Sequence, residues 1–288
     1  MMWQCQKAFE TEDGILDGHD GFKMEIPLLR SFLASKIEMD AFGIRPAYPG
    51  WRFRPPKAEE YDAAVLRLYQ LWERVVGHYS GLKMTFIKDK LPAFNAITSR
   101  FAQLTKDKPI LGLWETRLVQ GLAWKCQEPS KAISDNPSWS WLSRDGPVTY
   151  DHGVPDLSGH QELHCVVPAI QCTEISITWS GTPMVSMISK AALHLRGRLR
   201  EIKTDELRCM FDDGRNICSP TVLCVYLASV SNKWNSTAVV GYIVLLLDSS
   251  TQGEDSFRRS GIATIHTKSG EENYELFEGV DDVEFWLL

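Results

Sequence analysis

The spacing of apolar residues predicts helices in the first half of the chain. Apolar side chains recur at steps of three and four over residues 59–79, which places them on one face of an amphipathic helix. A second helix is expected to begin after Leu91, because Pro92 suits a first helical turn and apolar residues follow with helical spacing. A third is predicted over residues 110–125, where leucines and two tryptophans make a wide apolar surface. Turn signals surround one shorter helix expected within residues 26–42.

After about residue 130 the pattern changes to short β-rich runs separated by turn residues. The strand candidates share a high content of Val, Ile, Leu or Thr and comprise residues 173–179, 191–199, 222–230 and 239–247. The sequence therefore predicts an α+β fold, with a helical first half packed on a β-rich second half that forms an antiparallel sheet or a sandwich. Residues 1–135 are expected to be a mainly helical region with an irregular N-terminal segment, and residues 136–288 a β-rich region.

Composition narrows the class of protein. The 288 residues are 44% hydrophobic and 24% charged, which is typical of a folded globular chain. A net charge of -6 supplies no general basic field, so a nucleic-acid partner is not expected. The longest apolar run, residues 238–247, is roughly half of the about 20 residues that a membrane-spanning helix needs. The sequence has neither a secretory leader pattern nor a cysteine arrangement typical of disulfides, so we expect a cytoplasmic protein. The sequence does not indicate the oligomeric state.

Tryptophans supply the first candidates for a binding surface. In PSWSW at residues 137–141, an extended chain would turn Trp139 and Trp141 to one face and the two serines to the other. With Trp114, these rings provide large apolar areas, and each indole nitrogen needs a partner when it is buried. The pattern favours core packing at a junction between helices and sheet. The alternative is an aromatic wall that binds a partner or a small apolar ligand.

A histidine-rich segment supplies the candidate catalytic residues. His160, Glu162 and His164 would share one face of a strand, shortly after His152. Two imidazoles and a carboxylate suit a divalent metal or an acid–base pair. However, the order differs from the HExxH helix of metalloproteases, and the Pro-Cys-x-x-Cys of zinc deaminases does not follow. We therefore expect neither a metal nor a cofactor, and an ordinary exposed loop and edge strand is the favoured alternative.

Three arginines alternate with smaller residues in a predicted strand. Arg196, Arg198 and Arg200 would lie on one strand face, where guanidinium groups suit a phosphate, a carboxylate or an acidic partner surface. Because the chain as a whole is acidic, the favoured interpretation is a solvated sheet face. The arginines would then pair with acidic residues that follow closely in the sequence, namely Glu201, Asp205 and Glu206.

Several phrases, in a fixed order, resemble fungal heterokaryon-incompatibility (HET) proteins in the region that follows their effector domain. The resemblance rests on the order of the phrases more than on any single one, and it spans nearly the whole chain. The stronger phrases are MWQC at 2–5, WERVVGHYS at 72–80, KMTFIKDKLPAFNAI at 83–97, ILGLWETRLVQGLAWKC at 110–126 and PSWSWLSRDGPVTY at 137–150. The weaker ones are LHLRGRL at 193–199 and FRRSGIATI at 257–265.

The resemblance implies an accessory or regulatory region that binds a protein partner or senses a ligand. The family's effector domain, which is linked with cell death when incompatible strains fuse, would lie before Met1. The absence of GxSxG, P-loop and GxGxxG motifs agrees with a noncatalytic role. The alternative is a HET-derived enzyme of fungal specialised metabolism, with a tryptophan-walled pocket and His/Glu acid–base chemistry. A truncated product, an excised fragment and a degenerate remnant are further open interpretations.

Overall fold

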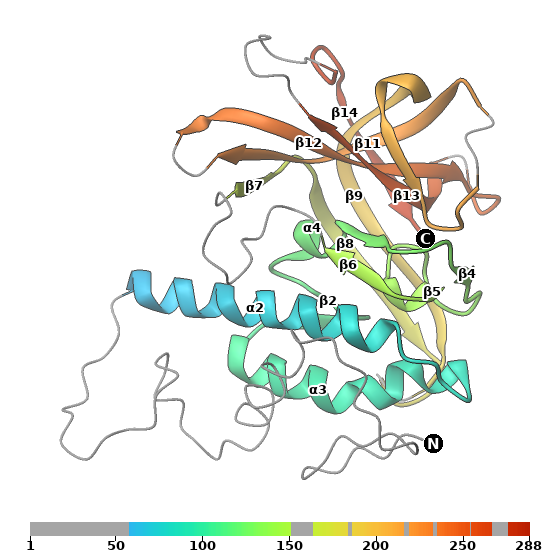
Figure 1. The fold of residues 1–288 in the computed structure, drawn as a ribbon. Helices are drawn as coiled ribbons and strands as arrows, with labels where there is room; N and C mark the ends of the chain where they lie inside the picture. Colours follow the sequence, from blue (N-terminus) through green and yellow to red (C-terminus); the bar gives the residue numbers. More distant parts are fainter. Residues whose placement is uncertain are drawn as a thin grey trace. The chain divides into compact units, whose positions relative to one another are not determined.

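Two amphipathic helices form where the periodicity predicts them. They are α2 (Ala58–Ser80) and α3 (Lys90–Thr105), and the single-turn helix η1 (Ile87–Asp89) leads into α3 (Figure 1). The ring of Trp72 in α2 lies 5.1 Å from the rings of both Phe94 and Phe101 in α3. All three side chains are buried, so an aromatic contact of this kind holds the two helices together.

The computed structural model describes residues 58–150, 164–183, 186–215, 219–232, 235–253, 255–266 and 276–288. The chain divides into two compact units, Met1–Arg67 and Leu68–Leu288, and the second unit contains most of the described residues. The helix expected within residues 26–42 lies outside the described residues. The domain boundary predicted near residue 135 stays a prediction.

The third predicted helix is wrong. Both Leu111 and Gly112 have a positive φ, 46° and 85°, which is incompatible with a continuous right-handed helix. A Cβ atom at Gly112 would lie 2.4 Å from the indole nitrogen of Trp141, so only glycine fits this turn. The apolar residues of this segment are buried on several sides of short elements, not along one helical face. These elements are β1 (Pro109–Ile110), β2 (Leu113–Trp114), α4 (Leu118–Gly121) and β3 (Trp124–Cys126).

Short elements continue up to the large sheet. Antiparallel pairs join β3 to β6 and β4 to β5. Between them lies PSWSW, which is not extended but forms a turn that enters a single-turn helix. The elements are β4 (Lys131–Ala132), η2 (Trp141–Ser143), β5 (Arg144–Asp145) and β6 (Val148–Tyr150).

The remainder of the chain is strand-rich, and the four predicted strands are confirmed as β8, β9, β11 and β12. They belong to an eight-stranded sheet with the order β7-β11-β12-β13-β14-β9-β8, and β10 pairs with β13. A further pairing between β9 and β11 makes the sheet barrel-like (Figure 1). The strands are β7 (His164–Pro168), β8 (Gln171–Trp179), β9 (Ile188–Lys203), β10 (Arg208–Phe211), β11 (Thr221–Asn232), β12 (Asn235–Ser249), β13 (Ser256–His266) and β14 (Asp282–Leu287), with η3 (Thr204–Glu206) after β9.

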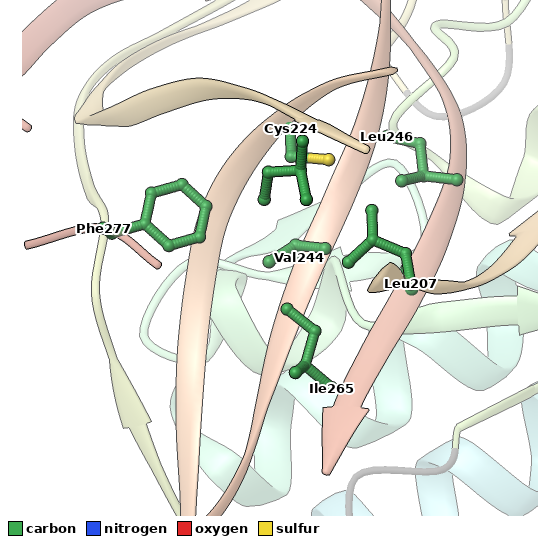
Figure 2. Packing of buried hydrophobic residues seen from close by; sticks show 8 residues of the cluster. Leu207, Cys224, Val244, Leu246, Ile265 and Phe277 are labelled. Atoms are coloured by element: carbon green, nitrogen blue, oxygen red, sulfur yellow. The ribbon is translucent and has the colours of Figure 1, made fainter. Parts of the chain in front are cut away.

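Alternate residues of the long strands supply a hydrophobic cluster on one face of this sheet. Val244 and Leu246 of β12 lie between Cys224 of β11 and Ile265 of β13, and Phe277 packs against the same cluster (Figure 2). These positions follow the two-residue repeat of a strand, which explains why the sequence predicted β11 and β12 correctly.

Substitution of Val244 should reveal how much this cluster stabilises the fold. The side chain is fully buried, so Val244→Ala should lower the free energy of unfolding by about 2 kcal/mol through lost burial and the cavity left behind. The matched control is Val283→Ala, because Val283 is 43% exposed and should lose much less. Equal losses in chemical denaturation would contradict the packing described here.

Candidate functional site

A β-bulge in β13 brings two polar side chains into the interior. The register between β12 and β13 shifts so that Leu246 pairs with Gly261 while Leu247 pairs with Arg259. Ser260 is thereby left as the extra residue, and such bulges change the direction in which side chains point. Arg259 and Ser260 are consequently both buried, whereas Arg258 is exposed.

Arg259 is held in the interior by a dense set of polar contacts. Its Nε donates to Oδ2 of Asp212 at 2.9 Å, and its Nη2 donates to Oδ1 of the same residue at 3.3 Å. Nη1 donates to the carbonyl oxygen of Leu122 at 2.6 Å, and Nη2 also donates to that of Trp124. The guanidinium carbon lies 3.4 Å from the centre of the Trp124 ring. Four donated hydrogen bonds and a ring face therefore accommodate this buried charge.

The serines of PSWSW connect the same region to neighbouring segments. The hydroxyl of Ser138 accepts from the backbone nitrogen of Arg259 at 2.9 Å and donates to the carbonyl oxygen of Leu288. The hydroxyl of Ser140 donates to the carbonyl oxygen of Leu111 at 2.6 Å. Both serines are buried, and these bonds satisfy their hydroxyl groups.

The three candidate tryptophans lie in the core. Trp139 and Trp141 are fully buried, and the indole nitrogen of Trp141 donates to the carbonyl oxygen of Gly112 at 2.9 Å. Trp114 is buried beside a cavity of about 10 Å³, which accommodates about one water molecule. Core packing at the junction between helices and sheet is therefore what the described residues display. Their proposed role in ligand or partner binding stays a prediction.

The strand arginines lie on one face of β9, as the alternation predicts, but their partners differ from the predicted ones. Arg196 and Arg198 each lie 3.7 Å from a carboxylate oxygen of Asp282 in β14. Arg198 also donates to the carbonyl oxygen of Phe277, and Arg200 donates to that of Leu276. Among the described residues, the contacts of these arginines thus come from a segment about 80 residues away and not from Glu201, Asp205 and Glu206. Arg198 and Arg200 bind the turn before β14, and Arg196 lies beside the first residue of β14.

Most of the histidine-rich segment lies outside the described residues, namely His152, His160 and Glu162. His164 begins β7, where its backbone pairs with Asn232 of β11. Within the described ranges, no group of three or more His, Cys, Asp or Glu residues is arranged to hold a metal ion. The catalytic assignment of these four residues stays a prediction.

A pocket of about 600 Å³ lies beside the buried Arg259, and its lining combines charged residues and serines with the apolar residues Pro129, Ala132 and Ile133. Its lining comes from the loop around β4, from η2 and β5, from the turn after β10, and from the facing ends of β12 and β13. The charged lining residues are mostly cationic: Lys131, Arg144, Arg215, Arg258 and Arg259 face only two carboxylates, Asp213 and Asp248. This excess of positive charge contrasts with the acidic chain as a whole, and it suits an anionic ligand.

Two of the cations are already neutralised. Nη2 of Arg215 donates to Oδ2 of Asp248 at 2.5 Å, and its Nε lies 3.6 Å from Asp213. Arg259 is bound to Asp212. In the described part of the chain, Lys131 and Arg258 form no ion pair and are exposed. The uncommitted charge is therefore found at these two residues and at Arg144.

Arg144 is the least satisfied of the buried charges. The residue is 8% exposed, and its Nη1 donates one long hydrogen bond to the carbonyl oxygen of Ser130 at 3.4 Å. Its Nη2 lies 3.9 Å from Asp212, which is already bound to Arg259. Its Nε has no hydrogen-bond partner among the described residues, and the same holds for the buried hydroxyl of Ser260. Such orphaned polar atoms are rare, and each costs roughly 1–3 kcal/mol.

Sequence reasoning missed this pocket, although one signal was present. FRRSG at residues 257–261 contains two adjacent arginines in a strand, so one of them has to face inward. An inward arginine needs a buried carboxylate, and Asp212-Asp213-Gly214 was one acidic turn signal in the sequence. Nothing in the sequence indicated that Arg144 would lie close to both.

Comparisons of the chain with protein-family models, with curated proteins and with solved structures found no match. Membership of the HET family therefore stays a prediction from the order of the sequence phrases. None of the described helices is both long enough and apolar enough to cross a membrane.

A buried lysine fixes the backbone of Arg144. Nζ of Lys90 donates to the carbonyl oxygen of Arg144 at 2.5 Å and lies 5.2 Å from the centre of the Trp141 ring. Burial lowers the pKa of Lys90 from 10.5 to about 8, although the negative charge of Asp145 counteracts this partly. The contact places Arg144 at the pocket, and it makes the stability of the fold depend on pH.

Loss of the Arg259 side chain should destabilise the fold strongly. Arg259→Met leaves the carboxylate of Asp212 buried without its main partner, so the free energy of unfolding should fall by about 3–5 kcal/mol. The double variant Arg259→Met, Asp212→Asn should recover part of this loss, because the unpaired charge is removed. Arg258→Met is the control, since Arg258 is exposed. Chemical denaturation measures the free energy of unfolding of the wild type and the three variants. A loss below about 1 kcal/mol for Arg259→Met would contradict the stabilising role of the Arg259–Asp212 pair.

The lowered pKa of Lys90 predicts that the stability of the fold changes between neutral and alkaline pH. Between pH 8 and 10 the unfolded chain keeps the proton on Lys90 while the folded chain releases it, so the free energy of unfolding should rise with pH. Relative to Lys90→Met, which has no such proton, the wild type should gain about 2 kcal/mol between pH 7 and 10. Denaturation at several pH values measures this difference. Parallel curves would show that Lys90 is not held in a desolvated site.

Proposed function

We propose that this chain is a noncatalytic, ligand-sensing or partner-binding region related to HET proteins, and that it binds an anionic group in the pocket beside Arg259. The single observation that carries the proposal is the guanidinium of Arg144: the residue lines a pocket of about 600 Å³, and its buried Nε has no hydrogen-bond partner among the described residues. The pocket volume falls in the range of small-molecule binding sites.

The energetics of Arg144 support binding of an anion. A buried charge without a full set of partners destabilises the unliganded protein. A bound anion supplies the missing acceptor and the missing negative charge at once, so binding should stabilise the folded chain. This difference between empty and occupied pocket is what a sensing region requires, because occupancy changes the stability of the segments that line it.

The rim of the pocket supports capture from solution. Lys131 and Arg258 are exposed and carry uncommitted charge, so they attract an approaching anion and align it with Arg144. The ligand is either a free small molecule or an acidic group on a protein partner, as expected for an accessory region. A cytoplasmic location is part of the same proposal.

Two of the phrases on which the HET resemblance rests also contribute to this pocket. PSWSWLSRDG includes Ser138, Ser143 and Arg144, and FRRSG includes residues 258–260. The proposal therefore links the resemblance and the pocket through the same residues. The alternative of a HET-derived enzyme stays a prediction, because its His and Glu residues fall mostly outside the described ranges.

Native mass spectrometry with an equimolar pool of anionic, neutral and cationic metabolites tests the proposal. The wild type should retain anionic members of the pool, and Arg144→Gln and Arg258→Gln should each reduce retention at least tenfold, about 1.4 kcal/mol. Arg208→Gln is the matched control, because Arg208 is an exposed strand arginine outside the pocket. Circular dichroism confirms that each variant is folded. Retention that is independent of ligand charge, or equal among the variants, would refute the proposal.

A further inference from the structure

We infer that the anion recognised in the pocket is the phosphoryl group of a phosphorylated sugar or polyol. This inference rests on the proposed binding function and specifies its ligand. Three features of the pocket carry it: the amount of uncommitted positive charge, the types of hydrogen-bond donor, and the composition of the remaining lining.

The charge in the pocket exceeds what one carboxylate neutralises. Lys131 and Arg258 form no ion pair in the described part of the chain, and Arg144 only shares Asp212 with Arg259. A carboxylate brings one negative charge and two oxygens. A phosphomonoester brings about 1.5 to 2 negative charges at neutral pH and three strongly accepting terminal oxygens. The phosphomonoester therefore matches the available cations better.

The donors that lack partners also suit a phosphoryl group. Nε of Arg144 is buried and free of a partner within the described residues, and the hydroxyl of Ser260 is likewise unpaired. A guanidinium binds two phosphate oxygens through parallel N–H groups, while a hydroxyl donates to a third. Both residues line the pocket and are more than nine-tenths buried, so a phosphoryl group reaches these two donors when their side chains turn toward the pocket.

The rest of the pocket favours a polyol over a nucleotide. A volume of about 600 Å³ leaves room for an organic moiety beyond the phosphoryl group. Among the described lining residues none is aromatic, so a nucleobase would find no ring on which to stack. The carboxylates of Asp213 and Asp248 can instead accept hydrogen bonds from sugar hydroxyls. Among the lining serines, Ser249 adds an exposed hydroxyl, whereas the hydroxyls of Ser130, Ser138 and Ser143 already donate to backbone carbonyl oxygens.

Isothermal titration calorimetry with glucose 6-phosphate, at constant ionic strength, is the direct test. Glucuronate is the matched comparison, because it carries a carboxylate at the position of the phosphoryl ester, and glucose and AMP are the further comparisons. We expect glucose 6-phosphate to bind at least tenfold more tightly than glucuronate or AMP, with no binding of glucose. Its affinity should also rise between pH 5 and 7, as the phosphoryl group loses its second proton near a pKa of about 6.

The outcomes separate this inference from the proposed function. Equal or tighter binding of glucuronate, sensitive to Arg258→Gln, would overturn the phosphoryl assignment and leave an anion-binding pocket. Tighter binding of AMP would overturn the polyol assignment. If neither the probes nor the metabolite pool bind, both the inference and the proposed function fail.

Ser260→Ala tests the phosphoryl assignment with a substitution that should leave the fold intact. The substitution removes a buried hydroxyl that has no partner, so the melting temperature without ligand should stay the same or rise. Affinity for glucose 6-phosphate should nevertheless fall at least fivefold, and Arg258→Gln should reduce it at least tenfold, with Arg208→Gln unchanged. Full affinity in both pocket variants would show that the sugar phosphate binds elsewhere and would overturn the assignment.

Discussion

The buried pair of Arg259 and Asp212 is the interaction on which the other contacts around the pocket depend. One guanidinium connects β13 to the turn after β10 and reaches the carbonyl oxygens of Leu122 and Trp124 at the start of β3. A charge so deeply buried is tolerated only when nearly every donor is used. The contacts therefore fix the position of three segments that are distant in sequence, and through Ser138 they also fix the turn that contains the tryptophans.

The same arrangement leaves its neighbour incompletely satisfied. Asp212 accepts two hydrogen bonds from Arg259, whereas the nearest guanidinium nitrogen of Arg144 lies 3.9 Å from the same carboxylate. Arg144 otherwise donates one long hydrogen bond, and Lys90 binds the backbone carbonyl of Arg144. A protein that maximised stability would replace such a residue with an apolar one. Among the described residues the indole nitrogens of Trp114 and Trp139 also lack a partner, but Arg144 combines an unsatisfied donor with a charge at a pocket, and such local conflicts are typical of binding sites. The packing of the interior therefore leaves Arg144 as the buried charge that the proposed anion would satisfy.

Predictions succeeded where the decisive interactions are local. The repeats in α2, α3, β8, β9, β11 and β12 follow from which side of each element faces the core, and a single sequence contains that information. The third helix was wrong because the turn at Leu111 and Gly112 depends on the indole of Trp141, about 30 residues away. The predicted partners of the β9 arginines were likewise wrong, because only the pairing of β14 with β9 brings Asp282 beside them.

The sequence alone determined the mixture of helices and strands, the alternation along the long strands, and the burial of the tryptophans, because each follows from periodicity and apolar area. Only the tertiary structure decided that residues 129–133, 143–144, 213–215 and 258–260 surround one pocket. It also decided which of two adjacent arginines turns inward. The physical reason is that burial of a charge depends on partners from remote segments, and no local pattern encodes where those segments meet.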